Sequence, residues 1–406
     1  MNASWSPVPR RRFGRTEIAM PVFSCGGMRY QQSWKDVEPG EIEADQQRQL
    51  EACIRRALEL GINHIETARG YGSSEWQLGR ILPTLPRDEI VVQTKIGPKE
   101  SATEFLSVFE TSMANLCLEH VDLLGVHGIN TPELIEQAVK PDGMWSAIRQ
   151  LQREGRVRHV GFSTHGPVEV IVRAIETDLF DYVNLHWYYV NPFNWPAVEA
   201  ATRHDMGVFI ISPNDKGGHL YAPSEKLRGL CAPLTPMQFN DLYCLSHPEV
   251  HTLSLGVARP SDFDEHVAAL GLGAERDGLL DRIDQRLRAA VVERHGAAWA
   301  ARWPVGLPDG TQVPGGVNLF EILRLWTYGT AWDLLGWAKA RYNLLGQGGH
   351  WFPGENAAAL PADDSWQACL SASPFRAEIP AILREAHALL HDQPVERQSR
   401  AGDQSN

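Results

Sequence analysis

Cysteine is sparse in this chain and is never paired at a metal-binding spacing. The six cysteines lie singly, with no C-x-x-C motif, at Cys25, Cys53, Cys117, Cys231, Cys244 and Cys369. Such scatter argues against zinc sites, iron–sulfur clusters and disulfide frameworks. We therefore expect no metal and no iron–sulfur cluster, and six reduced thiols in the core of a cytoplasmic protein.

Long apolar runs and basic clusters are also missing. No run approaches the ~18 apolar residues of a membrane span, and no apolar stretch follows Arg10, Arg11 and Arg12 as in a signal peptide. The 38 Lys and Arg residues are outnumbered by 50 Asp and Glu residues, which gives a net charge of -12. We therefore expect neither a membrane nor a nucleic acid as partner.

A third absence concerns dinucleotide-binding sheets. The first apolar run ends in Gly26-Gly27-Met28-Arg29-Tyr30, which is not the G-x-G-x-x-G pattern. This absence counts against the doubly wound open sheet, the main competitor to the architecture that the rest of the chain indicates.

What the chain does have is a regular alternation of strand-like and helix-like segments. The predicted strands are 20–25, 62–66, 90–96, 121–127, 157–163, 182–185, 207–212 and 251–256. Helix-like runs separate them, the first at 46–60, and the last, at 260–270, follows the eighth strand. Eight βα units in succession predict an α/β fold, a (β/α)8 TIM barrel, over residues 1–272.

The composition changes beyond the predicted barrel. Seven of the 13 tryptophans fall there, on helix-like runs such as 289–302 and 319–342: Trp299, Trp303, Trp326, Trp332, Trp337, Trp351 and Trp366. We expect them to pack in a mainly helical C-terminal extension over 273–395. The polar tail 396–406 is predicted to be disordered.

Polar residues end several predicted strands. Glu66, Lys95 and His127 close the second, third and fourth strands. Considered one at a time, a lysine at a strand end usually extends its ammonium into solvent, and a histidine there is usually a structural residue. Together they lie on the face where barrels of this kind keep their active sites.

A tyrosine joins this set from the loop after the second strand. Tyr71 lies between Gly70 and Gly72, which predicts tight backbone turns that hold its hydroxyl toward a cleft. The alternative is a solvated turn with a packed tyrosine.

Several motifs in order resemble those of the aldo-keto reductase superfamily. They span residues 10 to 270 and include Phe13-Gly14-Arg15-Thr16, the 66–75 block, Gln93-Thr94-Lys95, the 121–127 run and Val160-Gly161-Phe162-Ser163. The resemblance implies an NAD(P)H-dependent enzyme that reduces an aldehyde or ketone. The family's Asp, Tyr, Lys and His tetrad falls on Glu66, Tyr71, Lys95 and His127, with Glu in place of the usual Asp.

The chemistry of these four residues agrees with that implication. A carbonyl that receives hydride needs a proton, and a tyrosine with a free pKa near ~10 needs a neighbouring cation to give it. Lys95 is that cation, Glu66 holds its charge in place, and His127 orients the substrate oxygen.

The resemblance also implies a cofactor site for NADP (NADPH), with NAD as the alternative. Ser163 and Thr164 bind the nicotinamide carboxamide with Asn184, which stands where the family commonly has Gln. The loop with Ser212 and Lys216 covers the pyrophosphate. Gly256 and Arg259 hold the adenosine end, although Asp262 occupies a place where a basic residue often sits.

The C-terminal extension resembles that of a subgroup which ends in a ferredoxin-like cluster module. Here the Arg341-Tyr342 motif is followed by 343–354, a run without cysteine, and a cluster needs about four thiolates. A second interpretation rests on Glu66 in place of Asp and on the tryptophan-rich extension: a catalytically weak nicotinamide-binding regulatory or interaction protein, whose extension contacts a partner. The sequence leaves the substrate and the oligomeric state open.

Overall fold

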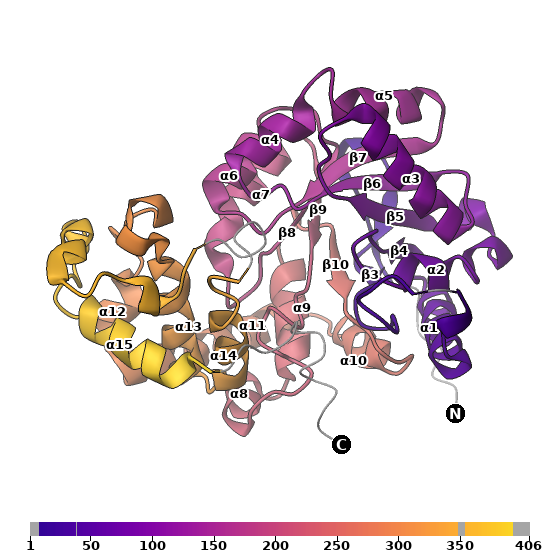
Figure 1. Ribbon diagram of the computed structural model, residues 1–406. Coiled ribbons are helices and arrows are strands. Elements are labelled where there is room, and N and C mark those ends of the chain that lie inside the picture. The colour runs from indigo at the N-terminus through magenta and orange to yellow at the C-terminus, as the bar shows by residue number, and fades with distance from the viewer. Residues whose placement is uncertain (1–7, 38, 348–353, 393–406) are drawn as a thin grey trace. The chain divides into compact units, whose positions relative to one another are not determined.

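Eight parallel strands close into a barrel in this computed structural model, which describes residues 8–37, 39–347 and 354–392 (Figure 1). In ring order they are β3 (Phe23–Gly26), β4 (His64–Glu66), β5 (Val91–Ile96), β6 (Val121–His127), β7 (Val157–Ser163), β8 (Tyr182–Leu185), β9 (Gly207–Ile210) and β10 (Thr252–Leu255). β10 pairs back onto β3. The predicted TIM barrel is confirmed.

Helices cover the outside of the ring of strands (Figure 1). They are α1 (Ala44–Glu59), α2 (Ser74–Leu78), α3 (Ala102–Leu116), α4 (Pro132–Val139), α5 (Met144–Arg153), α6 (Val168–Ile175), α7 (Trp195–Arg203), α9 (Pro236–Leu245) and α10 (Asp262–Ala269). Side-chain caps begin two of them, since Ser101 accepts from the main-chain N–H of Glu104 and Thr131 from that of Leu134. The sequence prediction missed α4, which has only eight residues.

The first predicted strand, 20–25, is in fact two strands. β1 (Arg10–Arg12) pairs antiparallel with β2 (Ala19–Pro21), and the chain enters the barrel only at β3. The break falls at Val22, whose main-chain N–H donates to Pro9 (2.9 Å) and whose carbonyl accepts from Leu253 of β10 (3.0 Å). The hairpin contributes Phe13 to the core, where its ring lies 5.7 Å from that of Tyr182.

The chain divides into two compact units. The barrel unit comprises Met1–Pro213 and Asn240–Gly271, and the helical unit comprises Asn214–Phe239 and Leu272–Asn406. The second unit resumes at the residue where the sequence placed the end of the barrel. Segment 214–239, which follows β9 and was assigned to the barrel, groups with the C-terminal helices instead.

The helical unit is built around one central helix. Its helices are α8 (Glu225–Cys231), α11 (Arg276–His295), α12 (Ala297–Arg302), α13 (Leu319–Ala331), α14 (Leu335–Tyr342) and α15 (Ile379–Leu390). α13 packs against α11, α14 and α15, and most of its residues are buried. Such all-round burial is typical of a core helix.

The tryptophans of this unit pack as predicted. Six are buried, namely Trp299, Trp303, Trp326, Trp332, Trp337 and Trp366. Trp351 and the tail 396–406 lie outside the described residues.

The two long helices predicted for this unit are each interrupted. Gly296, with φ 87°, separates α11 from α12, and Asp333, with φ 57°, lies between α13 and α14. A left-handed residue cannot continue a right-handed helix, so the chain turns at both places.

The prediction that every cysteine lies in the core is wrong for Cys117, which is exposed, while Cys369 is half-buried. Cys117 ends α3 in a left-handed conformation with φ 52°, a capping position at the surface. Within the described part of the chain, no helix combines the length and apolar character that crossing a bilayer requires.

Candidate active site

The four predicted catalytic side chains come from neighbouring elements at one end of the barrel. Glu66 is the last residue of β4, Lys95 is the penultimate residue of β5 and His127 ends β6, while Tyr71 lies in the loop after β4. Because the carboxyl ends of parallel strands share one rim, consecutive strands bring these residues together. The strand register pairs Glu66 with Gln93, two residues before Lys95.

A buried ion pair lies at the centre of the site. Lys95 Nζ contacts Glu66 Oε1, and the two side chains are only 1% and 2% exposed. Lys95 Nζ also donates to the main-chain carbonyl of Thr67 (2.7 Å), and Ser254 Oγ donates to Glu66 Oε2 (3.2 Å). Both carboxylate oxygens of Glu66 are therefore occupied, which fixes the orientation of the carboxylate.

The pair sets the charge state of the lysine. Burial lowers the pKa of Lys95 below that of a free lysine, and the negative charge of Glu66 opposes that change. The Lys95 ammonium depends on Glu66 to remain charged in this dry environment.

Tyr71 lies directly against this ion pair. Its hydroxyl donates to Glu66 Oε1 (3.4 Å), and Lys95 Nζ lies 4.6 Å from the centre of its ring. The ring edges of Trp34 and His127 meet it at centroid distances of 6.0 and 5.6 Å. The phenol is thus held between a cation and two aromatic rings.

Only one of the two glycines beside Tyr71 is required by the turn. Gly72 has φ 54°, and a Cβ there would lie 2.0 Å from the main-chain oxygen of Ser33. A Cβ on Gly70 would lie 3.7 Å from the ring of His127, an ordinary contact, and Gly70 has no positive φ. The predicted tight turn therefore rests on Gly72.

The next strands present a second polar group. Ser163 ends β7, where it pairs in register with His127 of β6 and with Asn184 of β8. Ser163 Oγ accepts from the main-chain N–H of Gly128 (3.1 Å), and the main-chain N–H of Thr164 donates to the carbonyl of Asn184 (3.0 Å). Ser163, Thr164 and Asn184 are therefore side by side and buried.

Asn184 has an unusual feature. Its side chain is fully buried, yet neither its amide nitrogen nor its amide oxygen has a hydrogen-bond partner among the described residues. Buried amides in folded proteins are normally satisfied, so an unsatisfied one indicates a missing partner. An amide offers both a donor and an acceptor, which suits another amide, such as the nicotinamide carboxamide, as that partner.

The remaining predicted cofactor residues of the barrel unit follow β9 and β10. Ser212 has φ 51°, an unusual left-handed conformation for a residue with a side chain. The carbonyl of Gly256 accepts from Arg29 Nη1 (2.8 Å). Arg259 pairs with Asp262 (Nε–Oδ1, 3.0 Å), whose other oxygen accepts from main-chain N–H groups of the same loop.

Lys216 belongs to the other unit, the helical one, in the segment that follows Ser212. Its predicted role in cofactor binding stays a prediction.

Comparison with known proteins finds a family model that is similar to part of the chain. Residues 23–208 match the model of the Aldo/keto reductase family. The matched span contains Glu66, Tyr71, Lys95 and His127. Over this span the barrel is similar to the aldo/keto reductase family. The match ends before Ser212, so the loops after β9 and β10 lie outside it.

Individual aldo/keto reductases resemble the chain over shorter stretches. A probable aldo-keto reductase 1 of Glycine max is 29% identical over 41% of this chain and 50% of its own length. L-glyceraldehyde 3-phosphate reductase of Escherichia coli is 26% identical over 39% of this chain and 45% of its own length. The chain therefore spans half or less of the length of these relatives.

Solved structures of the family share the fold. The holo form of an aldo-keto reductase from Bacillus halodurans is 20% identical, with a TM-score of 0.56, over 69% of this chain and 96% of its own. At this identity the likeness concerns the fold alone.

The barrel also brings together residues that sequence reasoning missed. Ser254 contacts Glu66 although 188 residues separate them, and Trp34 packs on Tyr71 from the loop after β3. Only the closure of the ring places β10 close enough to β4 for the first contact, and no spacing in the sequence signals it. Trp34 lay within a segment with no strand or helix period, so nothing marked it as a site residue.

Proposed function

We propose that this protein is an oxidoreductase that reduces an aldehyde or ketone to an alcohol with NADPH, using Tyr71 as the proton donor. The observation that carries the proposal is the buried Lys95–Glu66 ion pair in contact with the Tyr71 phenol. The match of residues 23–208 to the model of the Aldo/keto reductase family supports the reaction class.

Bound NADPH supplies the hydride for this reaction. The residues proposed to hold it are Ser163, Thr164 and Asn184 at the carboxamide, Ser212 and Lys216 at the pyrophosphate, and Gly256 and Arg259 at the adenosine end. The unsatisfied Asn184 amide beside Ser163 supports the first of these contacts.

Tyr71 supplies the proton. A carbonyl that gains hydride becomes an alkoxide, and the Tyr71 hydroxyl is the acid that neutralises it. An ordinary tyrosine, with a pKa of about 10, is too weak an acid at neutral pH. The Lys95 ammonium beside the ring stabilises the phenolate that remains, which makes the proton easier to give.

Glu66 and His127 complete the site. Glu66 keeps Lys95 charged and fixed, and its side chain reaches the ammonium in spite of its extra methylene relative to Asp. His127, edge-on to Tyr71, is proposed to hydrogen-bond the substrate oxygen and hold it near the phenol.

The preference for NADPH over NADH rests on Arg259. Its guanidinium is exposed and paired with Asp262 at the surface, where an ion pair has little net stability. Asp262 is also engaged by main-chain N–H groups of its loop, so Arg259 can turn to a 2′-phosphate while Asp262 keeps those bonds.

We further propose that the helical unit is the counterpart of the cluster module in the subgroup with a ferredoxin-like extension, without the cluster. Only Cys231 and Cys369 occur in its sequence, fewer than the roughly four thiolates that a cluster requires.

The test is a pair of measurements on the purified chain. Loss of NADPH absorbance is followed with a panel of aldehydes and ketones that includes L-glyceraldehyde 3-phosphate, the substrate named for one relative. NADPH and NADH affinities are titrated in parallel. Turnover with NADPH supports the proposal, whereas tight binding without turnover on any carbonyl favours a nicotinamide-binding regulatory protein.

A further inference from the structure

We propose that the helical unit controls cofactor affinity by fixing the loop that carries Lys216, with Trp337 as the positioning residue. The inference rests on the proposed function, in which Lys216 contacts the cofactor pyrophosphate. It gives the helical unit a definite role in that reaction, which neither the fold nor the family match assigns.

The first observation is the division of the chain. Segment 214–239 follows β9 in sequence and ends within α9, yet it groups with the C-terminal helices rather than with the barrel. Arg286 of α11 also donates to the carbonyl of Ala232, so this segment and α11 are joined inside one unit. The segment is therefore tied to residues of the helical unit.

The second observation is a hydrogen bond to Lys216 itself. The indole N–H of Trp337, in α14, donates to the main-chain carbonyl of Lys216 (2.8 Å). Trp337 is 1% exposed and is among the largest fully buried side chains. Fixing this carbonyl fixes the peptide plane, and with it the direction in which the Lys216 side chain leaves the backbone.

The indole is itself held in place. Arg324 of α13 lies over its ring, with the guanidinium carbon 5.3 Å from the ring centre. Arg324 makes two hydrogen bonds to Glu321 Oε2 (2.6 and 2.9 Å), and Arg341 adds another to Glu321 Oε1 (3.1 Å). These three charged side chains are largely buried, so α13 and α14 hold Trp337 as a rigid donor.

The loop around Lys216 is tightly turned. Tyr221 donates to Asp215 Oδ1 (2.5 Å), and the main-chain N–H of Leu220 donates to the carbonyl of Asn214 (2.8 Å). Gly218 has φ 128°, a conformation that residues with side chains rarely adopt. A change in the position of the Lys216 carbonyl therefore moves the loop as a body.

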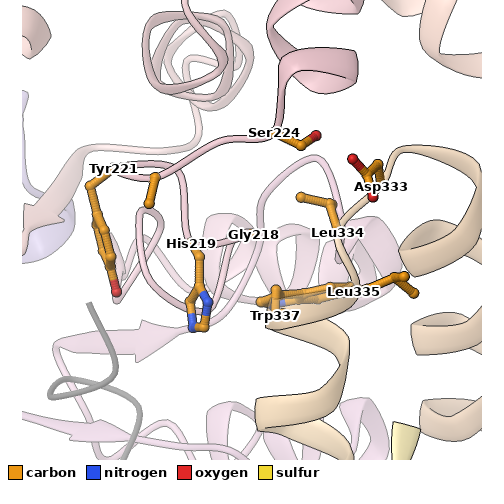
Figure 2. Close-up of a pocket in the computed structure, with 10 residues that line it drawn as sticks. Gly218, His219, Tyr221, Ser224, Asp333, Leu334, Leu335 and Trp337 are labelled. Carbon is orange, nitrogen blue, oxygen red and sulfur yellow. The ribbon is translucent and has the colours of Figure 1, made fainter. Parts of the chain in front are cut away.

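A cavity lies beside Trp337 and the loop, so packing alone does not hold the loop in position. Its volume is about 270 Å³. One wall is formed by His219 and Tyr221 of the loop (Figure 2). The other is formed by Asp333 and Leu334, in the turn that precedes α14, and by Trp337 of α14 itself. Because close packing does not fill this space, the loop has room to shift once the hydrogen bond is removed.

The experiment compares Trp337→Phe with the wild-type protein. Phenylalanine keeps a ring under Arg324 but removes the N–H donor. We expect the Kd for NADPH to rise about 3- to 10-fold, the range of a lost hydrogen bond. We expect kcat at saturating NADPH, and KM for the carbonyl, to be unchanged.

Trp299→Phe is the matched control. Trp299 is also buried in the helical unit, and its indole N–H donates to Thr327 Oγ1 of α13 (3.0 Å). Its loss should leave the Kd for NADPH unchanged. An equal rise in both variants, or none in Trp337→Phe, overturns the inference.

A double variant tests whether Trp337 acts through Lys216. Lys216→Met should weaken NADPH binding, and adding Trp337→Phe to it should weaken binding no further. Additive losses mean that Trp337 acts elsewhere, which contradicts the inference. If Lys216→Met alone has no effect, the role of Lys216 is wrong. A wild-type chain that binds no NADPH overturns the proposed function as well.

Amide hydrogen exchange of the wild-type chain gives a test that needs no variant to fold. NADPH binding should slow exchange both in residues 214–222 and in α14, because the Trp337 hydrogen bond links them. Protection in the loop without protection in α14 contradicts the inference.

Discussion

Glu66 keeps a buried cation in place within the site. Without its carboxylate, Lys95 would keep its hydrogen bond to the carbonyl of Thr67 and the weaker influence of the Glu75 charge, in a buried environment that lowers its pKa. A buried cation that loses its partner gives up its proton more readily. In the proposed mechanism, the acidity of Tyr71 therefore depends on a residue that does not itself exchange a proton with the substrate.

Glu66→Gln should shift the pH dependence of catalysis. With the opposing charge removed, burial lowers the pKa of Lys95 further. A lysine is charged only below its pKa, so its charge, and with it the acidity of Tyr71, is lost at a lower pH. We expect kcat/KM to fall on the order of tenfold, with the largest loss at neutral to alkaline pH. The measurement is a pH profile of kcat/KM, with the Kd for NADPH as a check on folding of the site.

Two further variants sharpen this experiment. Ser254→Ala removes a hydrogen bond to the same carboxylate but keeps the charge, so its pH profile should match that of the wild type. Glu66→Asp should retain a competent site, since it restores the residue that the family usually has. A Glu66→Gln profile identical to the wild type would show that the carboxylate has no part in setting the Lys95 charge.

Asn184 gives a prediction that separates binding from stability. Asn184→Leu replaces an unsatisfied buried amide with an apolar group of similar size. An unpaired buried polar group costs about 1–3 kcal/mol, so the cofactor-free variant should keep or raise its Tm. The Kd for NADPH should rise by roughly tenfold, because the carboxamide loses its partner. A large fall in Tm would mean that the amide is already bonded within the protein.

At the scale of elements, the loop from β4 to α2 positions Tyr71, the proposed proton donor. Its geometry depends on Gly72, where a Cβ would collide with the backbone of Ser33 and Trp34. Trp34 in turn packs against the Tyr71 ring. A side chain at position 72 would therefore displace Ser33 and Trp34, and a shift of Trp34 would move the Tyr71 ring that carries the hydroxyl.

Gly72→Ala should lower both Tm and kcat, because an alanine cannot adopt φ 54° without strain and has no room beside Ser33. Gly70→Ala adds the same methyl group one residue before Tyr71, where only an ordinary contact with His127 awaits it. Thermal unfolding and steady-state kinetics of the two variants make the comparison. Equal changes in Tm and kcat for the two variants would contradict the account, because they would show that the positive φ of Gly72 does not matter.

The strand ends were predictable from sequence and their cross-ring contacts were not. Glu66, Lys95 and His127 each end an apolar run, and parallel strands place such ends on one rim. The contact from Ser254 depends on closure of the barrel and leaves no local pattern. The breaks at Gly296 and Asp333 depend on single residues with positive φ, and the helical period over 289–302 and 319–342 runs through them.

At the scale of the whole chain, the order of segments is an incomplete guide to the units they form. The change in composition near residue 272 marks the return to the helical unit, and the tryptophan-rich run indicates its packing. Segment 214–239 follows a barrel strand, and no change in composition or run of tryptophans distinguishes it from the barrel sequence. Its assignment depends on contacts such as that of Trp337 with Lys216, more than 100 residues apart, which local reasoning cannot anticipate.

The most direct test of the account is the kinetics of Tyr71→Phe. The variant keeps the ring beside Lys95, Trp34 and His127 and removes only the hydroxyl. We predict that kcat for carbonyl reduction falls by about 10²–10⁴-fold, the range of general acid catalysis, while the Kd for NADPH stays within about twofold of the wild type. A variant that retains more than about a tenth of wild-type kcat would contradict the assignment of Tyr71 as the proton donor.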